Sequence, residues 1–351
     1  MTIRNARAPW WGLAGALAVL VTLATVASPK RTAPETTSEV RPFLRGMTIT
    51  CPRGGEIWGT ETMREALRDV KALGVDSVAI HPYARIERDG TVRFRPTADS
   101  PFLGRAVEMA RQEGISLFWK PHLAYWGNFV WRGEITFERD EDWQRFFRDY
   151  RAFILDQAAF AGRAGVPIFA VGVELEGTTS HEAEWRSLIA EIRRVFPGRL
   201  TYAANWDRVD AVPFWDALDL VGVQAYFPLS DADGPDETAL GAGWARELDR
   251  LGALSHRLGD KPVVFTEIGY NRSPVAARTP WDYRVEDNPA TRALRTRLLD
   301  VAITRAEAAP FVAGMYWWKW MPGHSFERSN FSMRDTEARE VLERRWAGHG
   351  R

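Results

Sequence analysis

Short apolar runs alternate with amphipathic helical segments along most of this chain. From Arg45 onward, eight runs rich in apolar and β-branched residues recur, a pattern typical of buried strands. They cover Arg45–Thr50, Asp76–Tyr83, Ile115–Leu123, Pro167–Glu176, Leu200–Trp206, Leu220–Tyr226, Pro262–Tyr270 and Phe311–Trp320. This alternation predicts a succession of strand–helix units.

The segments between the runs carry helix signals. One begins after Thr60, a predicted N-cap, and stops at Gly74. The next repeats this design, with Ser100 as the cap, Pro101 at the first helical position and Gly114 as the stop. Further helices are expected in "DEDWQRFFRDYRAFILDQAAFAGRAG", "EAEWRSLIAEIRRVF" and "ATRALRTRLLDVAITRAEA", whereas "DRVDAVPFWDALD", between the fifth and sixth runs, holds at most a short helix.

Eight strand–helix units predict an α/β fold, a single (β/α)8 TIM barrel. The alternative, a doubly wound sheet, would usually show a Gly-rich phosphate turn after an early strand, and the sequence has none. The 351 residues fit one barrel with insertions, and 45% apolar residues supply a large core. We assign the barrel to residues 44–346.

The N-terminal residues 1–28 carry a targeting pattern. Arg4 and Arg7 precede a long apolar run that ends in small residues near Ser28. This pattern favours an export signal over an uncleaved membrane anchor, although the run is near the minimum length for a spanning helix. Residues 29–43 are polar and read as a tether. The mature chain is therefore expected outside the cytoplasm: secreted, periplasmic or anchored by this segment.

Composition narrows the classes of partner. Lys plus Arg and Asp plus Glu both number 46, so charge gives no argument for nucleic acid or an anionic membrane surface. The single Cys and six scattered His form no metal-ligand spacing, so we expect no metal or cofactor. The 16 Trp suit a surface that stacks on sugar rings. We expect a monomer that binds a saccharide.

Polar and aromatic residues gather at the predicted strand ends, where barrel enzymes carry their catalytic groups. A buried charge costs several kcal/mol unless it is paired, so structural need does not explain them. The candidates are His81, Lys120, His122, Glu174, Glu176, Asn205, Trp206, Gln224, Tyr226, Glu267, Trp317, Trp318, Lys319 and Trp320.

Two carboxylates stand out because the fourth and seventh strands face each other across a barrel mouth. Two carboxyl groups about 5 Å apart suit retaining glycoside hydrolysis, one as nucleophile and one as acid/base. Glu267 ends the seventh strand, and Tyr226 on the neighbouring strand is placed to orient a nucleophile. On the fourth strand, Glu174 and Glu176 are two residues apart, so their side chains are expected on the same face and either could point inward. We favour Glu174, because Gly172 leaves open space before it.

The remaining candidates are interpreted as substrate-binding. Asn205 and Trp206 would contact sugar hydroxyls and rings, and Trp317 and Trp318 would form the floor under the sugar. Lys120 and His81 are also assigned here, while His122 is either a ligand-binding group or a hydrogen-bonded barrel histidine. Two long loops, Pro228–Gly243 and Asn271–Pro289, are expected to shape the subsites.

Four motifs together resemble the family 113 glycoside hydrolases: "VGVELEG", "FTEIGY", "LFWKPH…WRGEI" and "GMYWWKW". The likeness covers Leu44 to Pro322 and implies a retaining (β/α)8 glycosidase that hydrolyses β-mannan. It implies that Glu174 is the acid/base and Glu267 the nucleophile. Many relatives in this clan carry Asn before the acid/base, and this Asn contacts the sugar. This chain has Val173 at that position, so another residue must supply the contact.

The predicted function is a secreted or surface-tethered retaining glycosidase that cleaves a β-linked polysaccharide, with β-1,4-mannan the leading substrate. Action on another β-glycan is an alternative. A catalytically silent barrel that binds polysaccharide is a second, and the many Trp residues would suit it equally. A metal-dependent barrel hydrolase would need more ligands than His81 and His122.

Overall fold

The computed structural model describes residues 43–51, 54–323 and 330–349. The expected export signal, residues 1–28, lies outside the described residues, as does the tether apart from Phe43. None of the helices in the described part combines the length and apolar character needed to cross a lipid bilayer. The barrel expected over residues 44–346 falls within one compact unit, Arg41–Arg351.

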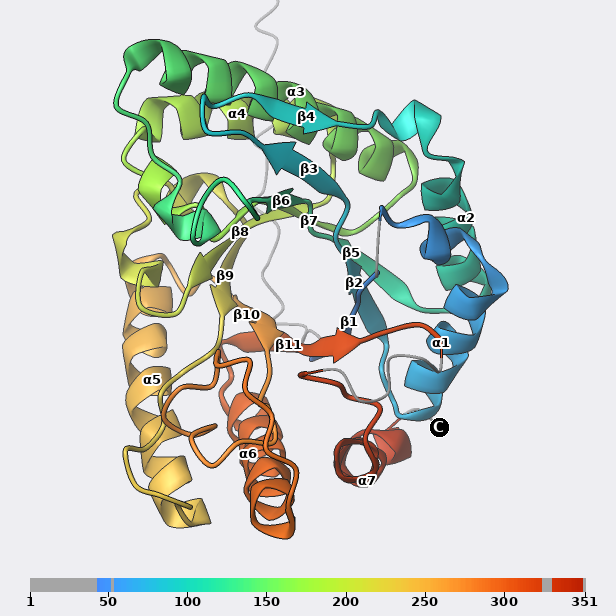
Figure 1. The fold of residues 1–351 in the computed structure, drawn as a ribbon, viewed down its shortest axis with the longest axis vertical. Helices are drawn as coiled ribbons and strands as arrows, with labels where there is room; N and C mark the ends of the chain where they lie inside the picture. Colours follow the sequence, from blue (N-terminus) through green and yellow to red (C-terminus); the bar gives the residue numbers. More distant parts are fainter. Residues whose placement is uncertain (1–42, 52–53, 324–329, 350–351) are drawn as a thin grey trace, which may run out of the picture. The chain divides into compact units, whose positions relative to one another are not determined.

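Parallel strands close into a barrel in the order β1-β11-β10-β9-β8-β7-β5-β2 (Figure 1). Each of the predicted apolar runs overlaps one of these strands, which confirms the TIM barrel. The strands are β1 (Leu44–Ile49), β2 (Ser77–Ile80), β5 (Ser116–Trp119), β7 (Ile168–Val173), β8 (Arg199–Asn205), β9 (Leu220–Gln224), β10 (Val263–Ile268) and β11 (Val312–Trp320).

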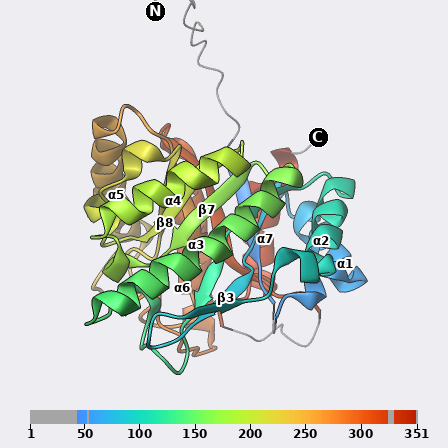
Figure 2. The ribbon, with the colours of Figure 1, turned by 90° about the horizontal axis from the view of Figure 1, so that it is seen from above.

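The helices flank the barrel, and Figure 2 shows α3 and α4 side by side in front of β7 and β8. All the helices expected from the sequence are present. The α-helices are α1 (Glu61–Ala72), α2 (Pro101–Gln112), α3 (Asp140–Arg163), α4 (Glu182–Val195), α5 (Glu237–Arg257), α6 (Pro289–Ala308) and α7 (Thr336–Arg345).

Three features of the fold were not predicted: helix α5, helix α7 and a small sheet. Helix α5 begins inside the stretch that we interpreted as the loop Pro228–Gly243, because the Asp236 carboxylate accepts the backbone N–H of Ala239 at 2.8 Å and caps the helix. A separate small sheet, in the order β4-β3-β6, lies at the barrel mouth end of β2 and β5. Its strands are β3 (Tyr83–Ile86), β4 (Val92–Phe94) and β6 (His122–Ala124).

The predicted boundaries of α1 and α2 are confirmed, but their capping contacts are not. Gly74 and Gly114 have left-handed φ values of 85° and 65° and terminate their helices. Thr60 and Ser100 occupy the N-cap positions, yet their hydroxyls donate to backbone carbonyls of the preceding turn rather than accept from the helix. Between β8 and β9 the chain forms only short 3₁₀ turns, in line with the weak helix signal there.

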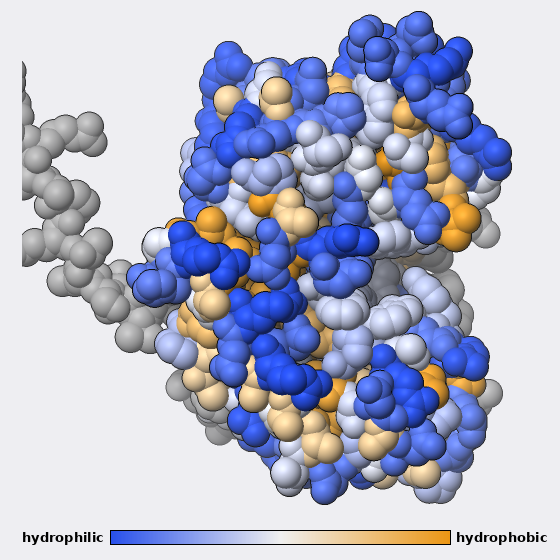
Figure 3. Space-filling view, turned by 90° about the vertical axis from the view of Figure 1, so that its left-hand side faces the viewer, coloured by the Kyte–Doolittle hydropathy of each residue, from blue (hydrophilic) through white to orange (hydrophobic). Residues whose placement is uncertain are grey.

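Two layers of apolar side chains hold the barrel together. The larger layer lies between strands and helices, and the smaller fills the barrel interior with residues such as Phe118, Val264 and Tyr316. Gly46 is required beside Tyr316, since a Cβ there would lie 2.4 Å from a ring carbon. On the face shown in Figure 3, hydrophilic residues predominate and hydrophobic residues appear in small groups among them.

Candidate active site

A cavity of about 370 Å³ lies at the C-terminal ends of the barrel strands. It brings together residues from five barrel strands or the loops directly after them, together with long loops of the rim. Its lining consists of His122, Tyr125, Trp131, Arg132, Glu174, Asn205, Trp206, Asp207, Tyr226, Glu267, Trp281, Tyr283, Trp318 and Phe331. Both predicted carboxylates, Glu174 and Glu267, therefore face one space.

Glu267 is held by two side chains, and a third lies close to it. The Tyr226 hydroxyl donates to its Oε2 at 3.2 Å, and the Lys120 ammonium donates to its Oε1. His122 Nε2 lies 3.7 Å from the same Oε1. The pairing of β10 with its neighbours shifts register between Phe265 and Glu267, and such irregularities re-aim side chains beside active sites. The carboxylate is thus oriented from both of its oxygens.

Lys120 has no exposed surface and does not line the cavity. Its ammonium also donates to the carbonyl of Thr266 at 3.0 Å, so it lies behind Glu267 rather than at the open space. Burial lowers the pKa of Lys120, while the charge of Glu267 opposes this shift. The expectation that Lys120 binds substrate directly is corrected: it contacts the carboxylate of Glu267.

Glu174 follows directly after β7, with a left-handed φ of 50°. The pairing of β7 with β8 shifts register between Ala170 and Val173, just before this residue. Its Oε2 lies 3.6 Å from the Arg132 guanidinium. Burial raises the pKa of the Glu174 carboxyl; Arg132 opposes this rise and the charge of Glu267 adds to it.

Arg132 was not predicted as a site residue, although it lies in the quoted motif "WRGEI". Its Nη1 lies 3.0 Å from His122 Nδ1, in addition to the contact with Glu174. The guanidinium also lies 5.5 Å from the centre of the Tyr125 ring. Arg132 and His122 therefore lie between Glu174 and Glu267, joined to each other by a hydrogen bond.

The two predicted histidines occupy different places. His122 lines the cavity, whereas His81 is buried beneath it, with ring centroids 5.0 Å from His122 and 5.6 Å from Trp318. Burial, reinforced by nearby cations, lowers the pKa of both histidines well below the usual value. Both rings are therefore neutral near pH 7, and His81 acts on the cavity only through its neighbours.

Glu176 differs from Glu174 although the two are only two residues apart. Strand β7 ends at Val173, so the expectation that both side chains lie on the same face does not apply. Glu176 does not line the cavity, and its Oε1 accepts the backbone N–H of Asn205 at 3.2 Å. The choice of Glu174 is supported, but our reason was wrong: a Cβ on Gly172 would lie 2.7 Å from the Trp185 ring, so no open space exists there.

Aromatic residues form much of the cavity wall. Trp318 lines it as expected, and Trp206 stacks on Trp281 with ring centroids 6.0 Å apart and planes at 17°. Trp281 and Tyr283, which are 45% and 67% exposed, come from the loop predicted to shape the subsites. The other predicted loop, Pro228–Gly243, contributes no residue to this lining.

The structure corrects the predicted position of Trp317. It was expected under the sugar, but it is fully buried in the layer between barrel and helices. Side chains alternate along a strand, so Tyr316 points into the barrel, Trp317 toward the helices and Trp318 toward the cavity. Among the described residues, no cluster of three or more His, Cys, Asp or Glu is arranged to hold a metal ion.

Solved structures similar to this chain share its fold over most of the length of this chain. A β-1,4-mannanase of glycoside hydrolase family 113 is 23% identical with a TM-score of 0.76, over 87% of this chain and 99% of that one. The family 113 β-mannanase AaManA from Alicyclobacillus acidocaldarius is 26% identical with a TM-score of 0.76, over 88% and 98%. A β-glucuronidase from Ruminococcus gnavus is more distant, at 15% identity and a TM-score of 0.61, over 87% and 50%.

The family comparison covers most of the described barrel. A search of curated proteins gives no match. The profile of Glycoside Hydrolase Family 113 matches residues 47–336, a span that includes both carboxylates and every residue of the cavity lining. This chain belongs to glycoside hydrolase family 113.

Proposed function

We propose that this protein is a retaining glycoside hydrolase that cleaves β-linked polysaccharide by double displacement. The observation that carries the proposal is the shared cavity, in which Glu267 and Glu174 have different surroundings. Glu267 has its charge compensated by Lys120 and accepts a hydrogen bond from Tyr226. Burial raises the pKa of Glu174, which favours a protonated carboxyl.

In the first step Glu267 attacks the anomeric carbon while Glu174 donates its proton to the leaving oxygen. In the second step Glu174 removes a proton from water, and that water displaces Glu267 from the sugar. Tyr226 and Lys120 each donate to one oxygen of the Glu267 carboxylate, and this fixes the orientation in which the carboxylate attacks. The separation of about 5 Å that a retaining pair requires stays a prediction.

The leading substrate is β-1,4-mannan. The family 113 structures named above are described as β-mannanases, and this supports the same substrate here. The stacked indoles of Trp206 and Trp281 suit contacts with sugar rings. The indole of Trp318 suits the floor beneath the reacting sugar. Asn205 is a candidate for the hydroxyl contact that Val173 does not supply.

We also propose that the enzyme acts outside the cytoplasm. The basic residues Arg4 and Arg7 and the apolar run after them support an export signal. The polar segment 29–43 would then join the barrel to this N-terminal segment. A polysaccharide substrate is consistent with this location.

Product analysis tests the proposed function. The protein is incubated with manno-, gluco- and xylo-oligosaccharides, and the anomer released first is recorded by NMR. We expect cleavage of β-1,4-linked manno-oligosaccharides with the β-anomer appearing first. An α-anomer would show inversion and contradict the double displacement, and binding without cleavage of any glycan would favour a silent polysaccharide-binding barrel.

Lys120→Met tests the support of Glu267. Removing one partner of a buried ion pair leaves the other charge uncompensated, so we expect kcat to fall roughly 100-fold and the free energy of unfolding to fall by about 3 kcal/mol. Steady-state kinetics and urea denaturation measure these effects. The control is Lys261→Met, because Lys261 precedes β10 at the opposite end of the barrel and donates to the Leu218 carbonyl. An unchanged kcat in Lys120→Met would contradict the role of the ammonium.

A further inference from the structure

Phe331 forms one wall of the cavity in an unfavourable backbone conformation. Its φ is 56°, in the left-handed region that residues with a Cβ rarely adopt. Its ring packs edge-on against Tyr226 and Tyr283, with centroids 6.0 Å and 5.6 Å apart. Such a conformation persists only where the surrounding contacts determine it, and it often marks a functional site. The contacts behind Phe331 therefore bear on the position of Tyr226.

Asn271 is the first of these contacts. It lies four positions after Glu267 and is 2% exposed. Its Oδ1 accepts the backbone N–H of Phe331 at 2.6 Å, and its Nδ2 donates to the carbonyl of Asp282. One buried amide thus joins the end of β10 to Phe331 and to the loop that carries Tyr283.

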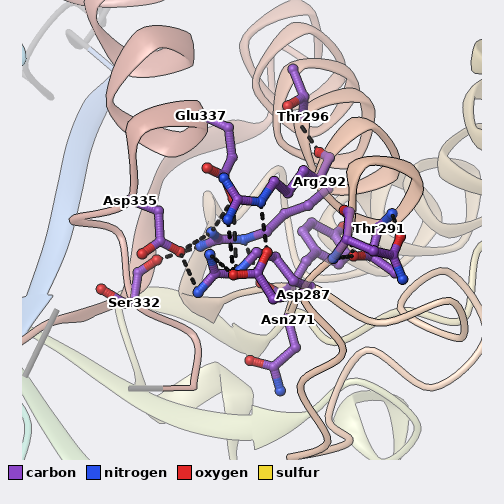
Figure 4. A network of polar contacts seen from close by, with 12 residues as sticks. Asn271, Asp287, Thr291, Arg292, Thr296, Ser332, Asp335 and Glu337 are labelled. Carbon is purple, nitrogen blue, oxygen red and sulfur yellow. Dashed lines mark hydrogen bonds and ion pairs between the residues drawn. The ribbon is translucent and has the colours of Figure 1, made fainter. Parts of the chain in front are cut away.

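Behind Asn271 lies a cluster of charged side chains, which we call the arginine network: Arg272, Arg295, Asp287, Asp335 and Glu337. Arg295 on α6 is 1% exposed and forms its closest ion pair with Asp335 at 2.6 Å. Arg272 contacts Asp287 at 3.2 Å and Asp335 at 3.5 Å. Figure 4 shows Asp287, Asp335 and Glu337 turned toward this cluster, with Asn271 at its edge.

Arg295 also binds two backbone segments, one next to Asn271 and one next to Phe331. Its Nε donates to the carbonyl of Tyr270, next to Asn271, at 2.9 Å. Its Nη2 donates to the carbonyl of Ser332, next to Phe331. A single guanidinium therefore fixes the two segments that Asn271 connects, and no member of the network lines the cavity.

Stability alone does not account for this arrangement. Buried ion pairs are often no more stabilising than apolar residues of similar volume, because each charge loses its hydration. A planar guanidinium with several fixed partners instead specifies geometry. The two segments that it specifies here lie beside Asn271 and Phe331. Phe331 packs against Tyr226, whose hydroxyl donates to Glu267.

We propose that Asn271 and the Arg295–Asp335 pair are positioning residues for the reaction. They hold Phe331 in place, and Phe331 holds the Tyr226 ring in the orientation that directs its hydroxyl to Glu267. None of them touches substrate. The kinetic part of this inference rests on the proposed function, whereas the structural part does not.

Asp335→Asn is the first test, because it removes the charge and keeps the shape. We expect amide hydrogen exchange in residues 330–333 to become at least about tenfold faster, since Phe331 loses its support. We expect kcat on oligosaccharides to fall roughly 10- to 100-fold with a much smaller change in KM, because the loss lies in orientation of the nucleophile. Mass spectrometry and steady-state kinetics measure both.

Asn271→Ala is the second test and leaves every charge in place. It should reproduce the exchange and kinetic effects of Asp335→Asn. In the double variant, the fold-loss of kcat should be smaller than the product of the two single fold-losses, because both residues act on Phe331. If Asp335→Asn fails to fold, the comparison of Asn271→Ala with the wild type decides the proposal alone.

Asp300→Asn is the matched control. Asp300 also joins α6 to α7, through Arg344 at 2.8 Å and Arg345 at 2.9 Å, but none of these residues contacts Asn271 or Phe331. Its kcat and its exchange in residues 330–333 should stay within about twofold of the wild type. Equal behaviour of Asp335→Asn and Asp300→Asn, or unchanged exchange in both test variants, would overturn the proposal.

The two proposals fail in different ways. A wild-type protein that cleaves no glycan would overturn the proposed function, and the exchange experiment would still decide whether the arginine network holds Phe331. A wild-type protein that cleaves glycans, with an unchanged kcat in Asp335→Asn and Asn271→Ala, would leave the function intact and overturn the positioning role.

Discussion

Glu267→Ala is expected to abolish glycan hydrolysis, with kcat on the order of 10⁵-fold below the wild type. The reason is that double displacement needs a carboxylate that forms a bond to the anomeric carbon. Lys120 and Tyr226 both donate to Glu267, so the variant also removes one acceptor from each of these two buried groups. Steady-state kinetics on the oligosaccharide that the wild type cleaves measures the loss.

Azide sharpens this test. In Glu267→Ala, azide fits the space of the lost carboxylate and attacks the anomeric carbon of an activated aryl β-glycoside. The C–N bond forms as the bond to the aryl oxygen breaks, so the product is the α-glycosyl azide. The control is Glu134→Ala, an exposed glutamate beside Arg132, which should retain wild-type kinetics. Full hydrolysis by Glu267→Ala would show that another group attacks.

Glu174→Ala is the second large effect, and it depends on the leaving group. For an oligosaccharide, whose leaving oxygen needs a proton, we expect kcat/KM to fall by about 10³- to 10⁴-fold. For an aryl glycoside with an acidic phenol the first step is much less affected, because the phenolate leaves unaided. Azide should then give the β-glycosyl azide, since Glu267 still forms the glycosyl-enzyme. An equal loss on both substrates would contradict an acid/base role.

The pH profile checks the same assignment. Burial raises the pKa of Glu174, so its acid form persists to higher pH than that of an ordinary carboxyl. Activity that needs this proton is present below the raised pKa and is lost as the pH rises through it. The alkaline limb of kcat/KM for an oligosaccharide, whose leaving oxygen needs this proton, should therefore disappear from the residual activity of Glu174→Ala.

Glu176→Gln is the matched control for that profile. Burial, with a further contribution from Glu174, raises the pKa of Glu176 to about 7, so this carboxyl titrates in the same range. Because Glu176 does not line the cavity, the alkaline limb should remain when it is replaced. If the alkaline limb disappeared in Glu176→Gln and remained in Glu174→Ala, Glu176 would be the proton donor. Our assignment of that role to Glu174 would then be wrong.

Much of the fold could be predicted from local patterns. Apolar runs and helix stops such as Gly74 and Gly114 act over a few residues, so their meaning does not depend on the rest of the chain. Helix α5 was not predicted, and its cap, Asp236, lies in an acidic, Gly-containing stretch that reads as a loop. The small sheet was missed because β3, β4 and β6 are only three or four residues long.

The site could be predicted only as far as barrel geometry carries information. Strand ends meet at one rim, and this alone predicts that Glu174, Tyr226 and Glu267 lie together. Arg132, Trp281, Tyr283 and Phe331 come from loops, and sequence patterns do not say where a long loop lies. The position of Phe331, for example, depends on a bond to Asn271, 60 residues away in the chain.

The sequence by itself determined the barrel, the family and the residues that end its strands, because each depends on local periodicity or on short motifs. Only the tertiary structure decided which way those residues point. The register shifts in β7 and β10 direct the two carboxylates, and Lys120 reaches Glu267 across 147 positions of the chain. The physical reason is that the orientation of a side chain follows from strand pairing and packing against distant segments, which no local pattern encodes.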